Sequence, residues 1–168
     1  MPVTDDLILP ADAGRSVKLA SLGVRFMLHG AQTGGRFALV EHPLPPRSLG
    51  SPVHTHHDED EFSFILEGEV GVQIGDRVLT AGPGTLITKP RGVPHAFWNA
   101  GDTHARLLEI ISPAGFEQYF EVMANLYASG PADPDRARDL QRRFHLDMDV
   151  ASIPRLIETY SLTRDNPS

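Results

Sequence analysis

Two histidines and a carboxylate lie close together in the first half of the sequence, with a spacing that suits joint chemistry. His54 and His56 are two residues apart, so on an extended strand both imidazoles point to the same face. Glu61 follows on the next run of residues that favours a strand. Imidazole and carboxylate groups that converge from neighbouring strands are typical ligands of a divalent transition metal. This stretch therefore predicts most of a metal site.

A further histidine can complete this site. Residues 84–99 read GTLITKPRGVPHAFWN, in which Pro90 and Gly92 predict a tight turn and His95 begins the strand that follows. If the strands close into a barrel, His95 meets the first two histidines and the carboxylate inside it. Three histidines and one glutamate leave coordination positions open for water, a substrate or dioxygen.

The residue types limit which metal such a site can hold. The chain has no cysteine, which excludes thiolate ligands and disulfides. We expect one divalent transition metal ion per chain, and Mn, Fe, Co, Ni, Cu and Zn all suit these ligands. His29 and His42 lie on or beside early strands, and a contact with the metal site is the less favoured interpretation for both.

Charge and composition narrow the class of partner. The formal net charge is −7, and basic residues are scattered singly apart from Arg142–Arg143, so we expect no nucleic-acid partner. The N-terminus has no signal-peptide pattern, and no apolar run is long enough to span a membrane. We therefore expect a soluble, cytoplasmic, single-domain protein of 168 residues that binds a small molecule.

Short strands separated by turn signals make up the part of the chain that must position the ligands. Because no helical pattern interrupts them, they predict an antiparallel β-sandwich or barrel. Residues 42–52 contain four prolines and are expected to form a loop that leads into the histidine strand. Besides the strand that carries His54 and His56, the expected strands cover residues 24–29, 37–41, 61–67, 70–74, 77–80, 85–89, 94–99 and 105–111.

After Pro113 the apolar period changes to that of a helix. Helices are expected from about residue 116 to Gly130, over 134–145 with Asp133 as N-cap, and near 152–160. The apolar stripe of these helices must be buried, either on the barrel or across a dimer interface, and we predict a homodimer.

In its spacing, the site resembles the two motifs of the cupin superfamily. His54-x-His56-x4-Glu61-x6-Gly68 is similar to the first motif, and Gly84-x5-Pro90-x-Gly92-x2-His95-x3-Asn99 is similar to the second. Ser48 stands where the first motif opens with glycine.

This resemblance implies an all-β fold, a double-stranded β-helix or jelly-roll barrel with a C-terminal helical tail. On this interpretation the single cupin domain spans residues 1–168, with an arm over 1–23, the barrel over 24–111 and a helical extension over 114–168.

Within the cupins, the segments HTHHDEDEF, LEGE, AGPG and PRGVPHAF resemble small bacterial quercetin 2,3-dioxygenase-like proteins. In that group the ligand glutamate also accepts a proton from the substrate, so the resemblance implies that Glu61 is both a metal ligand and a catalytic base. It implies an oxidoreductase, a dioxygenase that acts on a flavonol-like or other enolisable aromatic molecule. The alternatives are an isomerase, decarboxylase or lyase that uses the same metal, or a cupin that binds a small molecule without catalysis.

Three further side chains are candidates for the walls of a substrate pocket, namely Met27, Phe37 and Phe97. Phe97 shares a strand face with His95, whereas Trp98 faces the other way and is expected to pack outside the barrel, against the tail or a partner chain. Residues 57–60 are expected to form a solvated turn at the mouth of the barrel, because Asp60 and its neighbour Glu61 point to opposite faces.

Overall fold

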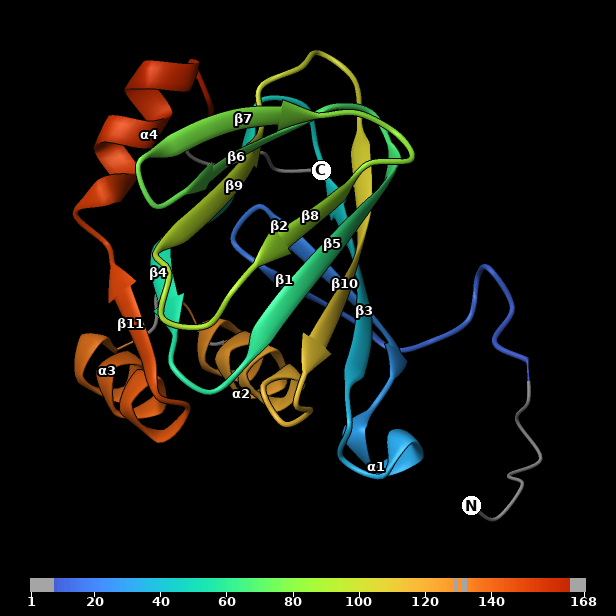
Figure 1. Cartoon of the computed structure of the whole chain (residues 1–168). Coiled ribbons are helices and arrows are strands. Elements are labelled where there is room, and N and C mark those ends of the chain that lie inside the picture. The colour runs from blue at the N-terminus through green and yellow to red at the C-terminus, as the bar shows by residue number, and fades with distance from the viewer. Residues whose placement is uncertain (1–7, 129, 131–132, 164–168) are drawn as a thin grey trace.

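The computed structural model describes residues 8–128, 130 and 133–163 (Figure 1). Within these residues, strands form two antiparallel sheets, one short helix lies between β2 and β3, and three helices follow β10. The strands are β1 (Ser16–Leu19), β2 (Leu22–Leu28), β3 (Ala38–Leu44), β4 (Ser48–His56), β5 (Asp60–Glu67), β6 (Val70–Ile74), β7 (Arg77–Ala81), β8 (Leu86–Lys89), β9 (His95–Asn99), β10 (Ala105–Ser112) and β11 (Leu146–Asp149). The helices are α1 (Gly30–Thr33), α2 (Glu117–Tyr127), α3 (Pro134–Arg143) and α4 (Ser152–Tyr160).

The two sheets face each other and enclose the core between them (Figure 1). One sheet has the strand order β1-β2-β3-β10-β5-β8, and the other has the order β11-β4-β9-β6-β7. Apolar side chains from both sheets, such as Val40, Ile65 and Val72, join in one buried cluster. This is the all-β jelly roll with C-terminal helices that the sequence predicts.

Strict alternation along β10 illustrates how the sequence selects the inner face. Ala105, Leu107, Glu109 and Ile111 are buried, while the residues between them are at least partly exposed. β10 lies between β3 and β5, so its inner face is at the centre of the larger sheet. The alternation therefore carries one acidic side chain, Glu109, into the core.

The prediction that residues 42–52 form a loop is wrong, although this segment contains four prolines. β3 continues to Leu44 and β4 begins at Ser48. Pro43 lies beyond the last residue pair of β3 with β2, and Pro52 lies where the register between β4 and β9 shifts. Proline lacks an N–H group, and positions outside a regular ladder are where a strand tolerates this loss.

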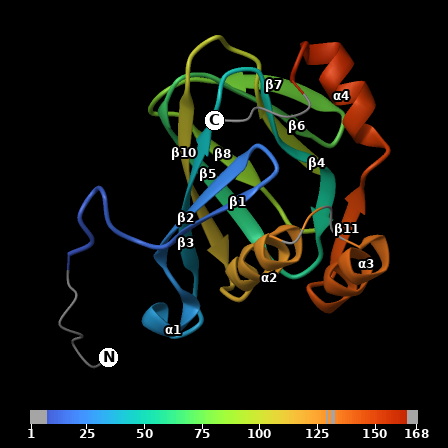
Figure 2. The ribbon, with the colours of Figure 1, turned by 180° about the vertical axis from the view of Figure 1, so that it is seen from behind.

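The C-terminal extension, residues 113–163, contains the three expected helices and one strand that the sequence does not predict. The Asp133 side chain accepts a hydrogen bond from the backbone N–H of Asp135, which confirms the predicted N-cap of α3. β11 pairs antiparallel with β4 and extends the smaller sheet (Figure 2). None of the helices in the described part of the chain has the length and apolar character to cross a membrane.

Candidate metal centre

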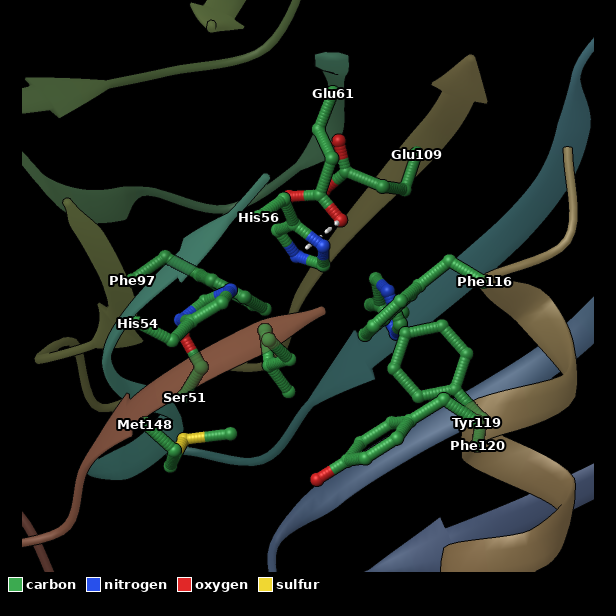
Figure 3. A pocket seen from close by; sticks show the side chains of 12 residues that line it. Ser51, His54, His56, Glu61, Phe97, Glu109, Phe116, Tyr119, Phe120 and Met148 are labelled. Carbon is green, nitrogen blue, oxygen red and sulfur yellow. Dashed lines mark ion pairs between the residues drawn. The ribbon is translucent and has the colours of Figure 1, made fainter. Parts of the chain in front are cut away.

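The four predicted ligands meet inside the barrel. His54 and His56 come from β4, His95 from β9, and Glu61 from β5 in the opposite sheet. All four are buried, and one ligand atom from each lies within 4.8 Å of those of the others. His54 and His95 are directly opposite in the register of β4 and β9, and their ring centroids are 4.3 Å apart. The two sheets together therefore hold a compact cluster of three imidazoles and a carboxylate. Figure 3 shows three members of this cluster, His54, His56 and Glu61.

Backbone carbonyls fix the orientation of two of the imidazoles. The Nδ1 atom of His54 lies 2.9 Å from the carbonyl oxygen of Pro52, and the Nδ1 atom of His95 lies 3.0 Å from that of Val93. A carbonyl oxygen only accepts hydrogen bonds, so each Nδ1 carries the hydrogen and donates it. The lone pair is then on Nε2, which is how metal-binding histidines are commonly oriented.

His56 provides the clearest sign that this cluster is built around a cation. Its Nε2 lies 3.3 Å from Glu61 Oε1 and its Nδ1 lies 3.4 Å from Glu59 Oε2. Neither ring nitrogen has a hydrogen-bond partner although both are buried. Buried polar atoms without a partner are rare in folded proteins. A metal ion held by the four ligand residues would give His56 Nε2 a partner, so the residues present fit the ion.

Glu59 differs from the prediction of a solvated turn over residues 57–60. Its side chain is buried, 7% exposed, and one of its carboxylate oxygens faces His56. Asp60, in contrast, points outward to Arg91, with an ion pair of 2.7 Å, as the parity of adjacent strand residues predicts. A carboxylate beside the Nδ1 atom of a ligand histidine is a common way to orient that ring.

Burial and nearby charges shift the pKa values of two of the ligands, His54 and Glu61, in the direction that metal binding requires. Burial lowers the pKa of His54 well below its ordinary value, and the nearby His95 and His56 add to this shift. Burial alone would raise the pKa of Glu61, but Lys89, His56 and His95 together hold it well below its ordinary value. These shifts favour a neutral imidazole at His54 and an ionised carboxylate at Glu61, the forms that bind a metal ion.

A buried lysine connects the cluster to a second carboxylate. Lys89 Nζ lies 2.8 Å from Glu61 Oε2 and 2.7 Å from Glu109 Oε2, and the Ser63 hydroxyl also donates to Glu109. Lys89 and Glu109 are each 1% exposed. Burial raises the pKa of Glu109 to about 7, while Glu109 and Glu61 raise the pKa of Lys89 despite its burial. Lys89 thus stays charged and supports the ionised form of Glu61.

Sequence reasoning missed this pair, although a signal for one of its members is present. Glu109 stands between Leu107 and Ile111 at the core-facing positions of an alternating strand. A charged residue at such a position is costly unless it is paired, so the alternation could have indicated a buried partner. For Lys89, the last residue of β8, the sequence offers no comparable signal.

His42 also lines the site, which the sequence did not favour. Its Nδ1 donates to the carbonyl oxygen of Gly23 at 2.9 Å, and its ring packs against Phe97 and Phe120. Burial lowers the pKa of His42 to about 4, so its ring is neutral near pH 7.

A small cavity of about 50 Å³ lies beside the cluster. Its polar lining comes from the barrel, and much of its apolar lining comes from α2 and β11. Phe116, the N-cap residue of α2, packs edge-on against the His56 ring, with the centroids 4.2 Å apart. Figure 3 shows Met148 and Tyr119 on the side of the cavity away from Glu61. The lining residues are His42, Ser51, His54, His56, Glu61, Phe97, Glu109, Phe116, Tyr119, Phe120, Leu146 and Met148.

Of the three predicted pocket residues, Phe97 lines this cavity and Met27 and Phe37 do not. Both are partly exposed, and in each case the adjacent residue is the buried one, Phe26 beside Met27 and Ala38 beside Phe37. An error of one residue in strand parity reverses the face to which a side chain points. Trp98 packs outside the barrel as predicted, stacked on Tyr160 of α4 with the ring centroids 4.0 Å apart.

Comparison with known proteins agrees with this architecture. Residues 41–111 match the family described as "Cupin domain". No match was found among curated proteins.

Several solved structures are similar in fold. A predicted oxalate decarboxylase from Thermotoga maritima is 18% identical, with a TM-score of 0.60 over 64% of this chain and 99% of that one. The cupin domain of Cnp3 from Schizosaccharomyces pombe is 16% identical, with a TM-score of 0.56 over 67% and 77%. A sugar phosphate isomerase from Silicibacter pomeroyi is 22% identical, with a TM-score of 0.54 over 62% and 74%. Residues 41–111 of the chain therefore match the cupin domain, and the fold is that of a jelly-roll cupin.

Proposed function

We propose that the protein is a metal-dependent dioxygenase that acts on a flavonol-like or other enolisable aromatic small molecule. The observation that carries the proposal is the buried cluster of three histidines and Glu61 that opens into a cavity with aromatic walls. Phe97, Phe116 and Phe120 line the cavity, and aromatic side chains pack well against an aromatic substrate. The choice of a dioxygenase depends on the resemblance to quercetin 2,3-dioxygenase-like cupins, with dioxygen as the co-substrate.

The residues have separate roles in this proposal. His54, His56, His95 and Glu61 would hold one divalent ion, which would supply a positive charge that stabilises negative charge on a substrate oxygen. Glu61 would also accept the proton of the substrate hydroxyl. Lys89 keeps Glu61 ionised, and the aromatic side chains of α2 keep bulk water out of the cavity.

A second candidate is an isomerase, decarboxylase or lyase that uses the same ion without dioxygen. The small size of the cavity favours it, because about 50 Å³ accommodates only a small molecule or the reacting end of a larger one. Two of the similar structures bear the names of such enzymes, a predicted oxalate decarboxylase and a sugar phosphate isomerase.

The test begins with metal analysis of the protein as purified. Oxygen uptake is then measured against a panel of flavonols and catechols, with turnover in the absence of oxygen as the parallel assay. Metal-dependent oxygen uptake supports the dioxygenase, and metal-dependent turnover without oxygen selects the second candidate. Saturable binding with no turnover in either assay would mean that the protein only binds its small molecule.

Replacement of the proposed base tests its role directly. Glu61→Gln removes the proton acceptor but keeps the size of the side chain, and Glu67→Gln, on the exposed end of the same strand, is the matched control. We expect the first variant to lose turnover and the second to keep it. Full turnover and full metal content in Glu61→Gln would exclude the base role.

The homodimer remains a prediction. Light scattering coupled to size-exclusion chromatography gives the mass in solution, and a mass equal to a single chain would contradict it.

A further inference from the structure

A larger, apolar chamber of about 300 Å³ lies directly outside the metal cavity. Its walls come from the β1–β2 turn, from β4 and from the C-terminal extension, with Met123, Ala137, Ile153 and Ile157 among them. None of the side chains that line it carries a charge. Its size is at the lower end of the range of small-molecule binding pockets.

Three side chains separate this chamber from the metal cavity. Ser51, Tyr119 and Met148 line both spaces. Met148 lies opposite His54 in the register of β11 and β4. The chamber is thus one layer of side chains away from a metal ligand, so a molecule that extends through this layer can occupy both spaces.

The Ser51 hydroxyl is an unused polar group at this junction. The residue is 9% exposed, and its Oγ is buried with no hydrogen-bond partner in the structure. A buried hydroxyl without a partner is unfavourable, and a ligand that supplies one recovers that free energy. The junction therefore offers an unused hydrogen-bonding group, the Ser51 hydroxyl, to a ligand.

We propose that the outer chamber binds the apolar body of the substrate, while its polar end passes Ser51 into the metal cavity. This inference rests on the proposed function, in that a small molecule reacts at the metal centre. It narrows the substrate to a neutral, hydroxylated molecule with an aromatic or alkyl body, because a charged group in the chamber would be buried without a counter-charge. Tyr127 and Val150 at the rim are 43% and 61% exposed, so the chamber is reachable from solvent.

The test measures binding of para-alkylphenols with methyl, propyl and pentyl chains to the protein as purified, by calorimetry. We expect the dissociation constant to fall by about fourfold for each methylene that enters the chamber. The propyl compound with a carboxylate at the end of its chain is the matched charged probe, and we expect it to bind at least about tenfold more weakly.

A substitution in the wall of the chamber then tests whether the alkyl chain binds there. Ala137→Phe narrows the chamber from α3, and Ala128→Phe, at the exposed end of α2, is the control. We expect the first to weaken pentylphenol binding at least about tenfold, with metal content and mass in solution unchanged, and the second to have no effect. The chain-length series on the native protein tests the proposal even if Ala137→Phe fails to fold.

The outcomes separate this inference from the proposed function. Affinity that is independent of chain length, or equal affinity for the charged probe, would overturn the chamber as a substrate site, whatever the metal content. A change in the mass in solution of the Ala137→Phe variant would show that a second copy of the chain covers this surface. That result would also overturn the chamber as a substrate site. A protein that binds no metal but shows the chain-length series would instead refute the proposed function.

Discussion

The cavity has two walls that differ in chemistry and in their place along the chain. The ligand wall consists of the four ligand residues, His54, His56, Glu61 and His95, together with the buried pair Lys89 and Glu109. Of these six, His54, His56, Glu61 and Glu109 line the cavity directly, and all six lie within the residues that match the cupin domain. The extension wall consists of Phe116, Tyr119, Phe120, Leu146 and Met148, and lies beyond that match. The fold of the domain thus supplies the reactive groups, and a separate segment shapes the space in which a molecule would meet them.

The two walls also differ in how a substitution affects the residues around it. The charges of the ligand wall are buried and stabilise one another, so the loss of any one of them leaves its partners unsatisfied. The extension wall carries no charged side chain, and its packing tolerates changes of similar volume. We therefore expect substitutions in the ligand wall to have large effects on metal binding and stability, and conservative substitutions in the extension wall to have small ones.

The largest expected effect is on metal binding by the ligand wall. His95→Ala removes one of four ligands, so we expect metal affinity to fall more than about 100-fold, since changes around the ligands alone cost 10–100-fold. Competition titration with a chelator measures the affinity. His104→Ala, in the loop before β10, is the control and should bind as the native protein does. Unchanged affinity in His95→Ala would place the ion elsewhere.

The next effect concerns stability. Lys89→Met leaves Glu61 and Glu109 buried without their cation, which we expect to lower the free energy of unfolding by about 3–5 kcal/mol. Urea unfolding of the metal-free protein measures it, with Arg77→Met on the exposed strand β7 as control. A loss no greater than that of the control would show that the two carboxylates do not need this lysine.

His42, which also lines the cavity, should make the free energy of unfolding depend on pH. Its pKa is about 4 in the folded protein and about 6.5 when unfolded, so between these values the unfolded chain binds more protons. Stability should therefore fall as the pH decreases from 6.5 to 4, with His42 contributing roughly 3 kcal/mol of the loss.

His42→Asn keeps a donor for the Gly23 carbonyl but has no titration in this range. Unfolding of the metal-free variant in urea at several pH values should show a shallower slope than the native protein. An identical slope would mean that His42 does not couple folding to pH.

The smallest effect is expected in the extension wall. Met148→Leu changes a side chain opposite His54 with little change of volume, so stability should fall by less than about 1.5 kcal/mol. We expect metal affinity, measured by the same competition titration, to stay within about twofold of the native value. A tenfold fall would show that the two walls are not separate, with the thioether taking part in the metal site.

Much of the ligand wall could be predicted from sequence because strand parity is a local property. The spacing of His54 and His56, and the choice of Glu61 over Asp60, follow from which face each residue occupies. The partner of a buried charge is not local. Glu109 and Lys89 meet across two strand pairings of β5, and Glu59 is buried by the turn that brings it under His56.

In the fold, too, local features could be predicted from the sequence and long-range pairing could not. The barrel and the three C-terminal helices follow from periodicity and turn signals, whereas β11 could not be predicted. Its four residues, Leu146–Asp149, alternate too briefly to identify a strand, and they become one by pairing with β4, about ninety residues earlier. Pairing between segments so far apart in the chain cannot be recognised from the residues near either segment.

The place of β11 at the border of its sheet has a consequence for how the protein behaves towards other copies of itself. Without β11, residues Val53–His56 at the end of β4 would present unpaired backbone groups to solvent. Exposed strand edges recruit strands from other chains and promote aggregation. β11 covers this part of the edge and displays the exposed side chains of Asp147 and Asp149, so the border of the sheet is negatively charged there. The same strand that closes the cavity thus also protects the barrel against growth into fibres.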